Sequence, residues 1–166
     1  MAKSRADTRL IHELDVDPGV VAATFKESVV DRFVIRIDGH SLNYQEYLSL
    51  PKNQRSDDEA DAVDKRFASY ALKWLGFDNE DDWNYNRPQS GQKANRPDYA
   101  VNALIGKAFI WEDKNSTVDL EEGHLKQMRR YSVGTAGYAV WCNMRRILAV
   151  RFLSIERLDY EVIADI

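Results

Sequence analysis

Two short apolar runs joined by a turn constrain this chain more than any other feature of its sequence. The runs PDYAV (97–101) and KAFIWEDK (107–114) have the length of strands, and the residues between them fit the turn of a hairpin. Because successive strand residues point to opposite faces, Glu112 and Lys114 would share one face and Asp113 would lie on the other. The pattern therefore predicts a hairpin that carries a carboxylate and an amine side by side.

The same hairpin predicts which residues face each other. Paired positions have a constant sum, so a turn centred near Ile105 sets Asp98 opposite about residue 112. Like charges directly opposite destabilise a sheet unless a cation bridges them, and Mg²⁺ suits this role because it prefers hard oxygen ligands. We expect Asp98 and Glu112 to ligate Mg²⁺, with the backbone carbonyl of Asp113 within reach. Lys114 would orient an attacking water and stabilise negative charge on a phosphate.

The rest of the sequence predicts a small α/β domain around this hairpin. Apolar periodicity and end signals predict helices at 19–32, 43–50, 56–77 and 119–133. Further strands are expected at 33–38, 83–87, 137–142 and 146–152. This order predicts a central mixed sheet flanked by helices. We expect a single domain in which residues 56–166 form the core and residues 1–55 form a helical extension packed on the sheet.

The ends of the two main helices also carry sequence signals. Ser56 is the expected N-cap of the first helix, and Gly76 supplies its stop. Asp119 is the expected N-cap of the second helix, which has acidic residues in its first turn and basic residues later.

The composition excludes several kinds of site. Hydrophobic residues make up 44% of the chain, which is enough for a substantial core. The single cysteine, Cys142, excludes an intrachain disulfide or a CxxC redox pair, and we expect it to be buried. The three histidines lack the spacing of zinc ligands. There is neither a membrane-length apolar run nor a secretory signal, so we expect a cytoplasmic protein.

The charge is divided unevenly along a chain whose net charge is −4. Residues 86–151 hold 11 basic against 6 acidic residues, whereas residues 1–85 hold 11 against 17. The basic segment includes the hairpin and is compatible with a nucleic-acid partner, although this excess alone would bind DNA weakly and lose the contact in salt. A solvated basic face without a partner is the alternative.

RPD at 96–98 followed by WEDK at 111–114 resembles the PD-(D/E)XK nuclease superfamily. The resemblance implies a restriction-endonuclease-like αβββαβ core and metal-dependent hydrolysis of DNA. It also implies that Asp98 and Glu112 ligate Mg²⁺, for which Mn²⁺ would substitute, and that Lys114 assists catalysis.

A second motif narrows this resemblance. Gln127 and Tyr131 lie four residues apart on the second predicted helix and so share a face. They resemble the QxxxY motif of RecB-like nucleases and HsdR-type restriction subunits, which implies that Gln127 helps to arrange the site. In those subunits the first helix contributes a Glu before an LGF or LGW sequence, and Glu59 is similarly placed. Asp64 and Asp61 are the alternatives, and Glu59 could instead complete a capping box with Ser56.

The resemblance implies a Mg²⁺-dependent DNA endonuclease, most like the nuclease module of a restriction-modification enzyme. Methyltransferase, translocase or specificity parts would then lie outside these residues. Candidate DNA contacts on the second helix are Lys126, Arg129, Arg130 and Tyr131. Arg145 and Arg146, in the last predicted turn, are further candidates for phosphate contacts. The alternatives are a complete nuclease of DNA repair or recombination, and a non-catalytic DNA-binding or assembly module with the same fold.

Overall fold

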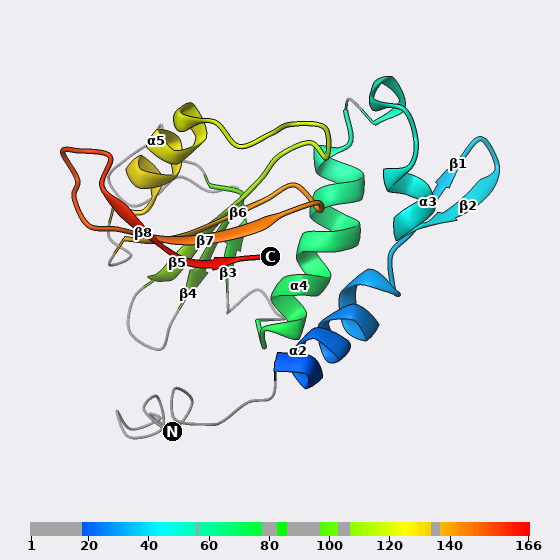
Figure 1. The fold of residues 1–166 in the computed structure, drawn as a ribbon, viewed down its shortest axis with the longest axis horizontal. Coiled ribbons are helices and arrows are strands. Elements are labelled where there is room, and N and C mark those ends of the chain that lie inside the picture. Colours follow the sequence, from blue (N-terminus) through cyan, green and yellow to red (C-terminus); the bar gives the residue numbers. More distant parts are fainter. Residues whose placement is uncertain (1–17, 56, 78–82, 86–96, 103–106, 134–136) are drawn as a thin grey trace.

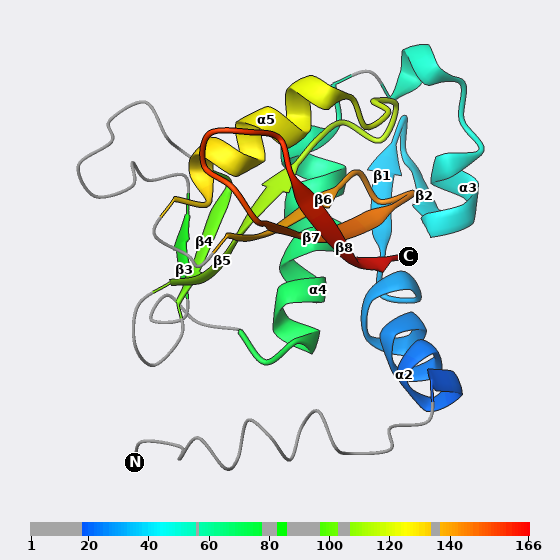
Figure 2. The same ribbon diagram turned by 60° about the vertical axis from the view of Figure 1, so that its left-hand side comes forward.

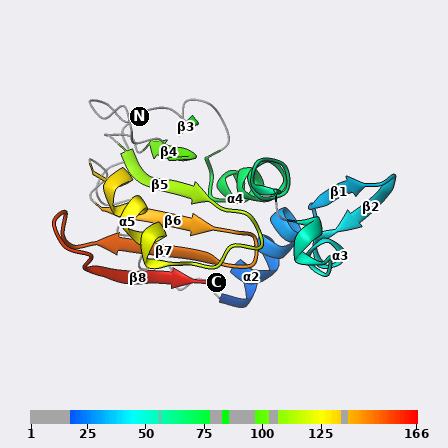
Figure 3. The same cartoon turned by 90° about the horizontal axis from the view of Figure 1, so that it is seen from above.

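A mixed six-stranded sheet lies at the centre of the molecule. The structure is a computed structural model and describes residues 18–55, 57–77, 83–85, 97–102, 107–133 and 137–166. In order across the sheet, the strands are β3 (Trp83–Tyr85), β4 (Tyr99–Asn102), β5 (Lys107–Asp113), β6 (Tyr138–Cys142), β7 (Ile147–Phe152) and β8 (Tyr160–Asp165). Figure 3 shows the strands side by side with helix α5 (Glu122–Tyr131) lying across them. The expected α/β class is therefore confirmed.

The pairing of β4 with β5 has the register that the sequence predicts. The partners Tyr99 with Trp111, Ala100 with Ile110 and Val101 with Phe109 have a constant sum, before an irregularity at Asn102. Extending this register by one residue sets Asp98 opposite Glu112. Strands β5 and β6 are parallel, and α5 forms the crossover that such a connection requires, while all other neighbours are antiparallel.

Each face of the sheet is covered by its own apolar cluster. The face under α5 buries Ile110, Leu125, Met128, Tyr131, Ala139, Trp141, Leu148, Val150 and Phe152. The opposite face packs Trp111 and Cys142 against η3 (Glu59–Ala68) and α4 (Ser69–Trp74). Ile110 and Trp111 thus enter different clusters, which confirms the alternation predicted for β5.

The N-terminal part contains the helices predicted at 19–32 and 43–50 and the strand predicted at 33–38, and one further strand that was not predicted. It consists of α2 (Pro18–Phe25), η1 (Lys26–Val30), β1 (Val34–Ile37), β2 (His40–Asn43), α3 (Tyr44–Leu48) and η2 (Lys52–Gln54). The β1–β2 hairpin turns at Asp38 and Gly39, both with positive φ, as a two-residue hairpin turn requires. This hairpin and α3 lie beyond α4 from the strands β3, β4 and β5 (Figures 1 and 2).

The N-terminal part packs mainly on the helices rather than on the sheet. Phe33 and Tyr47 are buried in the same cluster as Phe67 of η3. Within residues 18–55, η1 contacts α4 and β1 contacts η3. One apolar core crosses the expected boundary at residue 55.

Two helix starts differ from the sequence prediction. The first helix begins at Glu59 as a π-helix, and the predicted cap, Ser56, lies outside the residues that the structure describes. It ends at Trp74, with Leu75 as its C-cap, and the predicted stop Gly76 follows with a φ of 93°, which favours glycine. The second helix begins at Glu122 with Glu121 at its N-cap position, and the predicted cap, Asp119, forms an ion pair with Arg145.

Strand β8 was not predicted. It pairs with β7 along the edge of the sheet, and nearly all of its side chains are exposed. None of the helices in the described ranges has the length and apolarity of a segment that crosses a membrane.

Candidate active site

The site forms where β4 begins and β5 ends. Glu112 is the penultimate residue of β5 and is only 3% exposed, beside Trp141 of the parallel strand β6. Lys114 follows the strand, and its backbone N–H donates to the carbonyl of Cys142 at 2.9 Å. Because this bond continues the β5–β6 ladder, the chain stays extended through Lys114. Glu112 and Lys114 therefore share a face, as alternation predicts.

Asp98 reaches the same place from β4. It stands one residue before that strand, and its Oδ2 accepts a hydrogen bond from the backbone N–H of Asp113 at 2.7 Å. The carboxylate of Asp98 therefore accepts a backbone hydrogen bond at the end of β5. This bond fixes the carboxylate of Asp98 beside that of Glu112.

The ammonium group of Lys114 is the cation nearest to these carboxylates among the contacts described. Its Nζ donates to Oε1 of Glu112 at 2.7 Å and to the carbonyl oxygen of Asp113 at 2.9 Å. Both side chains of the ion pair are largely buried. The pair therefore lies in a medium where charge interactions are stronger than at the surface. Structure and prediction agree that Asp98, Glu112 and Lys114 come together.

The charges in this group strongly affect one another. Burial, and after it the charge of Glu112, raises the pKa of Asp98 from 3.8 to about 7. Burial also raises the pKa of Glu112, although Lys114 and the backbone of Asp98 offset part of this effect. Burial alone would lower the pKa of Lys114, but the carboxylates, Glu112 first, outweigh it and leave that pKa raised. The site therefore holds more negative charge than its one lysine neutralises.

The donor atoms fit a hard divalent cation. Oε2 of Glu112 is buried and has no hydrogen-bond partner among the described residues. Glu112, Asp98 and the carbonyl of Asp113 supply oxygen ligands of the type that Mg²⁺ prefers. Within the described ranges, no three Asp, Glu, His or Cys side chains converge closely enough to hold a metal by themselves. The protein therefore offers two carboxylates and leaves the remaining positions of a metal to water or phosphate oxygens.

Among the acidic residues of the first helix, Glu59 is the one whose charge acts on Asp98, Glu112 and Lys114. Its charge raises the pKa of Asp98, of Glu112 and of Lys114. The alternatives have other partners: Asp61 forms an exposed ion pair with Arg66, and Asp64 is buried and accepts a hydrogen bond from Tyr99.

The QxxxY pair is present as a contact. Nε2 of Gln127 donates to the hydroxyl of Tyr131 at 2.9 Å on α5. Tyr131, the last residue of α5, is buried against the sheet, which leaves it little surface for the predicted DNA contact.

His124 lies on α5 one turn before Gln127, and its ring contacts the ring of Trp141. Burial, and after it the charge of Lys114, lowers the pKa of His124. The N-terminal half of α5 thus lies close to the site.

The sequence interpretation did not single out His124 as a site residue. Its position three residues before Gln127 was the available signal, because residues three apart share a helix face.

The predicted basic contacts mostly have partners within the chain. Lys126 forms an ion pair with Glu122, and the guanidinium of Arg130 lies 5.5 Å from the ring centre of Tyr131. Arg145 pairs with Asp119, and Arg146 with Asp165. The basic residues at 87, 93 and 96 lie outside the described residues. Arg129, in the last turn of α5, is partly exposed.

The opposite face of β5 has a structural role. Asp113 is fully buried, and its Oδ1 accepts a hydrogen bond from Nε1 of Trp111 at 2.8 Å. Burial raises the pKa of Asp113 well above its usual value, and the charge of Asp98 adds to this effect. Cys142 is a free, buried thiol, as predicted. These side chains belong to the core.

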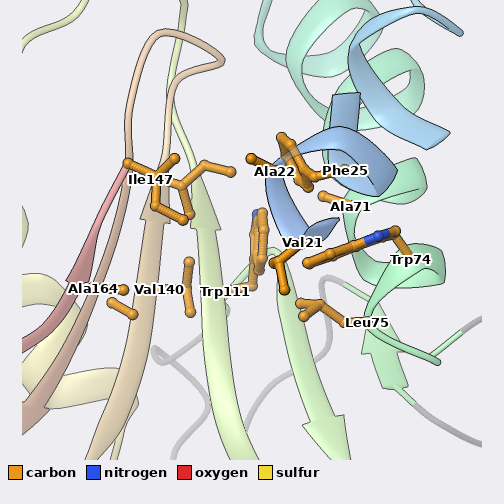
Figure 4. A pocket seen from close by; sticks show the side chains of 12 residues that line it. Val21, Ala22, Phe25, Ala71, Trp74, Leu75, Trp111, Val140, Ile147 and Ala164 are labelled. Atoms are coloured by element: carbon orange, nitrogen blue, oxygen red, sulfur yellow. The ribbon is translucent and has the colours of Figure 1, made fainter. Parts of the chain in front are cut away.

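An apolar pocket of about 620 Å³ lies on this opposite face (Figure 4). Side chains from α2, α4 and the sheet line it, among them Phe25, Trp74 and Trp111. None of Asp98, Glu112 and Lys114 lines this pocket. The pocket is thus distinct from the charged site.

Comparison of this chain with protein-family models, with curated proteins and with solved structures finds no match.

Proposed function

We propose that this chain is a Mg²⁺-dependent deoxyribonuclease that hydrolyses phosphodiester bonds, with Asp98, Glu112 and Lys114 at its active site. The observation that carries the proposal is the meeting of the buried carboxylate of Glu112 and the partly buried carboxylate of Asp98 with an ammonium group at 2.7 Å from Glu112. Such a cluster of charges costs folding energy, and no packing requirement of the sheet explains it. Its resemblance to the PD-(D/E)XK arrangement supports the assignment.

The residues would divide the chemistry among them. Asp98 and Glu112 would hold the metal, which when bound polarises the phosphate and lowers the pKa of a coordinated water. Lys114 stays protonated, because the surrounding carboxylates raise its pKa. Its ammonium group would therefore stabilise negative charge on the phosphate as the bond to the leaving oxygen breaks. Gln127, held by Tyr131, would help to orient the site from α5.

DNA is the proposed substrate, and the protein would act as one module of a restriction-modification enzyme. Of the basic side chains suggested as DNA contacts, Lys126, Arg145 and Arg146 are engaged in ion pairs, so this group offers DNA few free charges. Sequence recognition would therefore reside in methyltransferase, translocase or specificity parts. We expect this chain alone to cut DNA slowly and without sequence preference.

The test compares cleavage by the native chain with cleavage by Asp98→Ala, Glu112→Ala and Lys114→Ala. Supercoiled, linear and single-stranded DNA would each be incubated with Mg²⁺, Mn²⁺ or EDTA. We expect metal-dependent cutting by the native chain and a loss of at least about a hundredfold in each variant, as for the removal of a group that stabilises charge in a transition state. Asp61→Ala, which removes an exposed carboxylate, is the matched control and should cut normally.

Two outcomes would overturn this assignment. Cutting that survives the substitutions at Asp98 and Lys114 would place the chemistry elsewhere. DNA binding without any metal-dependent cutting would instead favour the non-catalytic binding or assembly module. Efficient cutting at a specific sequence by this chain alone would favour a complete nuclease over a module.

A further inference from the structure

The residue that follows Lys114 caps the first helix from a distant part of the chain. Oδ1 of Asn115 accepts hydrogen bonds from the backbone N–H groups of Asp58, at 3.1 Å, and of Glu59, at 2.9 Å. Helix η3 begins at Glu59, and the side chain of Asp58 makes no capping bond to it. Asn115 thus caps the N-terminus of η3 from outside the helix, because its side chain accepts hydrogen bonds from N–H groups that lack partners within the helix.

The carboxylate of Asp58 holds the opposite side of the same junction. Its Oδ1 accepts from the backbone N–H of Ser116 at 2.9 Å, and its Oδ2 accepts from the hydroxyls of Ser116 and Tyr47. Asp58 and Ser116 are both buried. Residues 58–59 and 115–116 are therefore joined by hydrogen bonds in both directions, and we call this set of bonds the 58–116 clamp.

The clamp connects the catalytic strand directly to Glu59. Asn115 is covalently adjacent to Lys114, and the N–H that it binds belongs to the residue whose charge acts on Asp98, Glu112 and Lys114. Asn115 carries no charge and is not a metal ligand in this arrangement. Its contribution to the site therefore passes through the position of Glu59.

We propose that Asn115 is a positioning residue that holds Glu59, the first residue of η3, at the end of β5 and thereby strengthens the binding of a divalent cation by Asp98 and Glu112. The proposal rests on the proposed function and adds to it the means by which the third carboxylate is placed. Without the bonds of Asn115, the first residue of η3 would be free to move its charge away from the site. The attraction between Glu59 and the cation would then weaken.

The test measures Mn²⁺ binding to the full chain by calorimetry, which does not depend on turnover. We expect Asn115→Ala and Glu59→Ala each to weaken binding on the order of tenfold, as is typical when a residue that orients a metal site is removed. In the double variant the loss should be no greater than in Glu59→Ala alone, because both changes remove the same contribution. Asn115→Asp keeps the accepting oxygen and should bind at least as tightly as the native chain.

Ser116→Ala separates positioning from general loosening. It removes the bond that the hydroxyl donates to Asp58 and the bond that it accepts from Arg55, but it keeps both bonds of Asn115. We expect it to lower the unfolding temperature while leaving the Mn²⁺ affinity unchanged. Should Asn115→Ala not fold, Asn115→Gln gives the same comparison, because it keeps the amide but moves its oxygen.

The outcomes distinguish this inference from the proposed function. If the native chain does not bind Mn²⁺, or if Asp98→Ala binds it equally well, the proposed function fails and this inference fails with it. If Asp98→Ala loses binding but Asn115→Ala retains native affinity, only the role of Asn115 is overturned. The same conclusion follows if Ser116→Ala loses as much affinity as Asn115→Ala, or if the losses from Asn115→Ala and Glu59→Ala are additive.

Discussion

The carboxylate of Asp98 is bound by the backbone N–H of Asp113 at 2.7 Å, so a side chain takes a hydrogen-bond position at the end of β5. This bond holds Asp98 beside Glu112 even though the two carboxylates repel each other. The resulting repulsion adds to the effect of burial and raises the pKa of Asp98 to about 7. The protonation of the site should therefore change near neutral pH, where it can be measured.

The first prediction concerns stability and pH in the absence of metal. Because the pKa of Asp98 is raised from 3.8 to about 7 on folding, the folded chain binds more protons than the unfolded chain between these values. The contribution of this group to the free energy of unfolding is therefore full below the lower value and is lost as the pH rises to about 7. Thermal unfolding in EDTA across this range should show a decline that Asp98→Asn removes.

The stabilisation of the fold by a bound metal should depend on pH in the opposite direction. A cation competes with the proton on Asp98, so the increase in unfolding temperature caused by Mg²⁺ or Mn²⁺ should grow as the pH rises through about 7. Unfolding curves with and without metal, on both sides of this pH, would measure it. An increase of equal size at every pH would show that the metal binds elsewhere.

The two carboxylates should respond differently to neutral substitution. Asp98→Asn can still accept the bond from Asp113 but no longer repels Glu112, so at neutral pH in EDTA it should stabilise the fold by roughly 1 to 3 kcal/mol. Glu112→Gln leaves the largely buried Lys114 without its ionic partner and should destabilise the fold. Both should lose the stabilisation by metal. Urea unfolding gives the free energies, and a gain in both variants would contradict the ion pair.

Deleting one oxygen atom removes the hydrogen bond between Gln127 and Tyr131. Tyr131→Phe deletes the hydroxyl that accepts from Gln127, which should cost about 1 kcal/mol of stability, the usual net value of a hydrogen bond. If Gln127 helps to arrange the site, the cutting rate should fall well beyond this small loss of stability. Tyr160→Phe, on the edge strand β8, is the matched control and should cut normally. Equal rates for both variants would leave Gln127 outside the active site.

The central hairpin could be predicted from sequence because it depends on local rules. Strand alternation and the constant sum of paired positions are enough to set Asp98 opposite Glu112 and to place Lys114 on the face of Glu112. The same rules explain why Trp111 and Asp113 share the opposite face. The alternation of apolar and polar residues along the two strands is enough to predict which residues share a face.

The features that sequence did not predict depend on contacts between distant residues. The capping of η3 by Asn115 joins residues more than fifty positions apart, and no local pattern contains it. Periodicity places Glu59 and Asp64 on one helix, but only the hydrogen bond from Tyr99 shows that Asp64 belongs to the core. Strand β8 was missed because its exposed side chains lack the alternation of a half-buried strand.

The shared core makes the N-terminal part necessary for the folding of residues 56–166. Phe33 is fully buried and contacts the rings of Tyr44 and Tyr47. Tyr47 in turn donates to Asp58 of the 58–116 clamp at 2.7 Å. Residues before the expected boundary at 55 therefore fill the cluster that supports η3. We expect residues 56–166 alone not to fold stably.

A single substitution tests this in the full chain. Phe33→Ala should lower the free energy of unfolding by roughly 3 to 5 kcal/mol, because it leaves a cavity in the core. The neighbouring Val34 is 50% exposed, so Val34→Ala should change that free energy by no more than about 0.5 kcal/mol. Urea unfolding would compare the two variants. If Phe33→Ala matched Val34→Ala, residues 18–55 would be an independent attachment, and the support that they give to the clamp through Tyr47 would be dispensable.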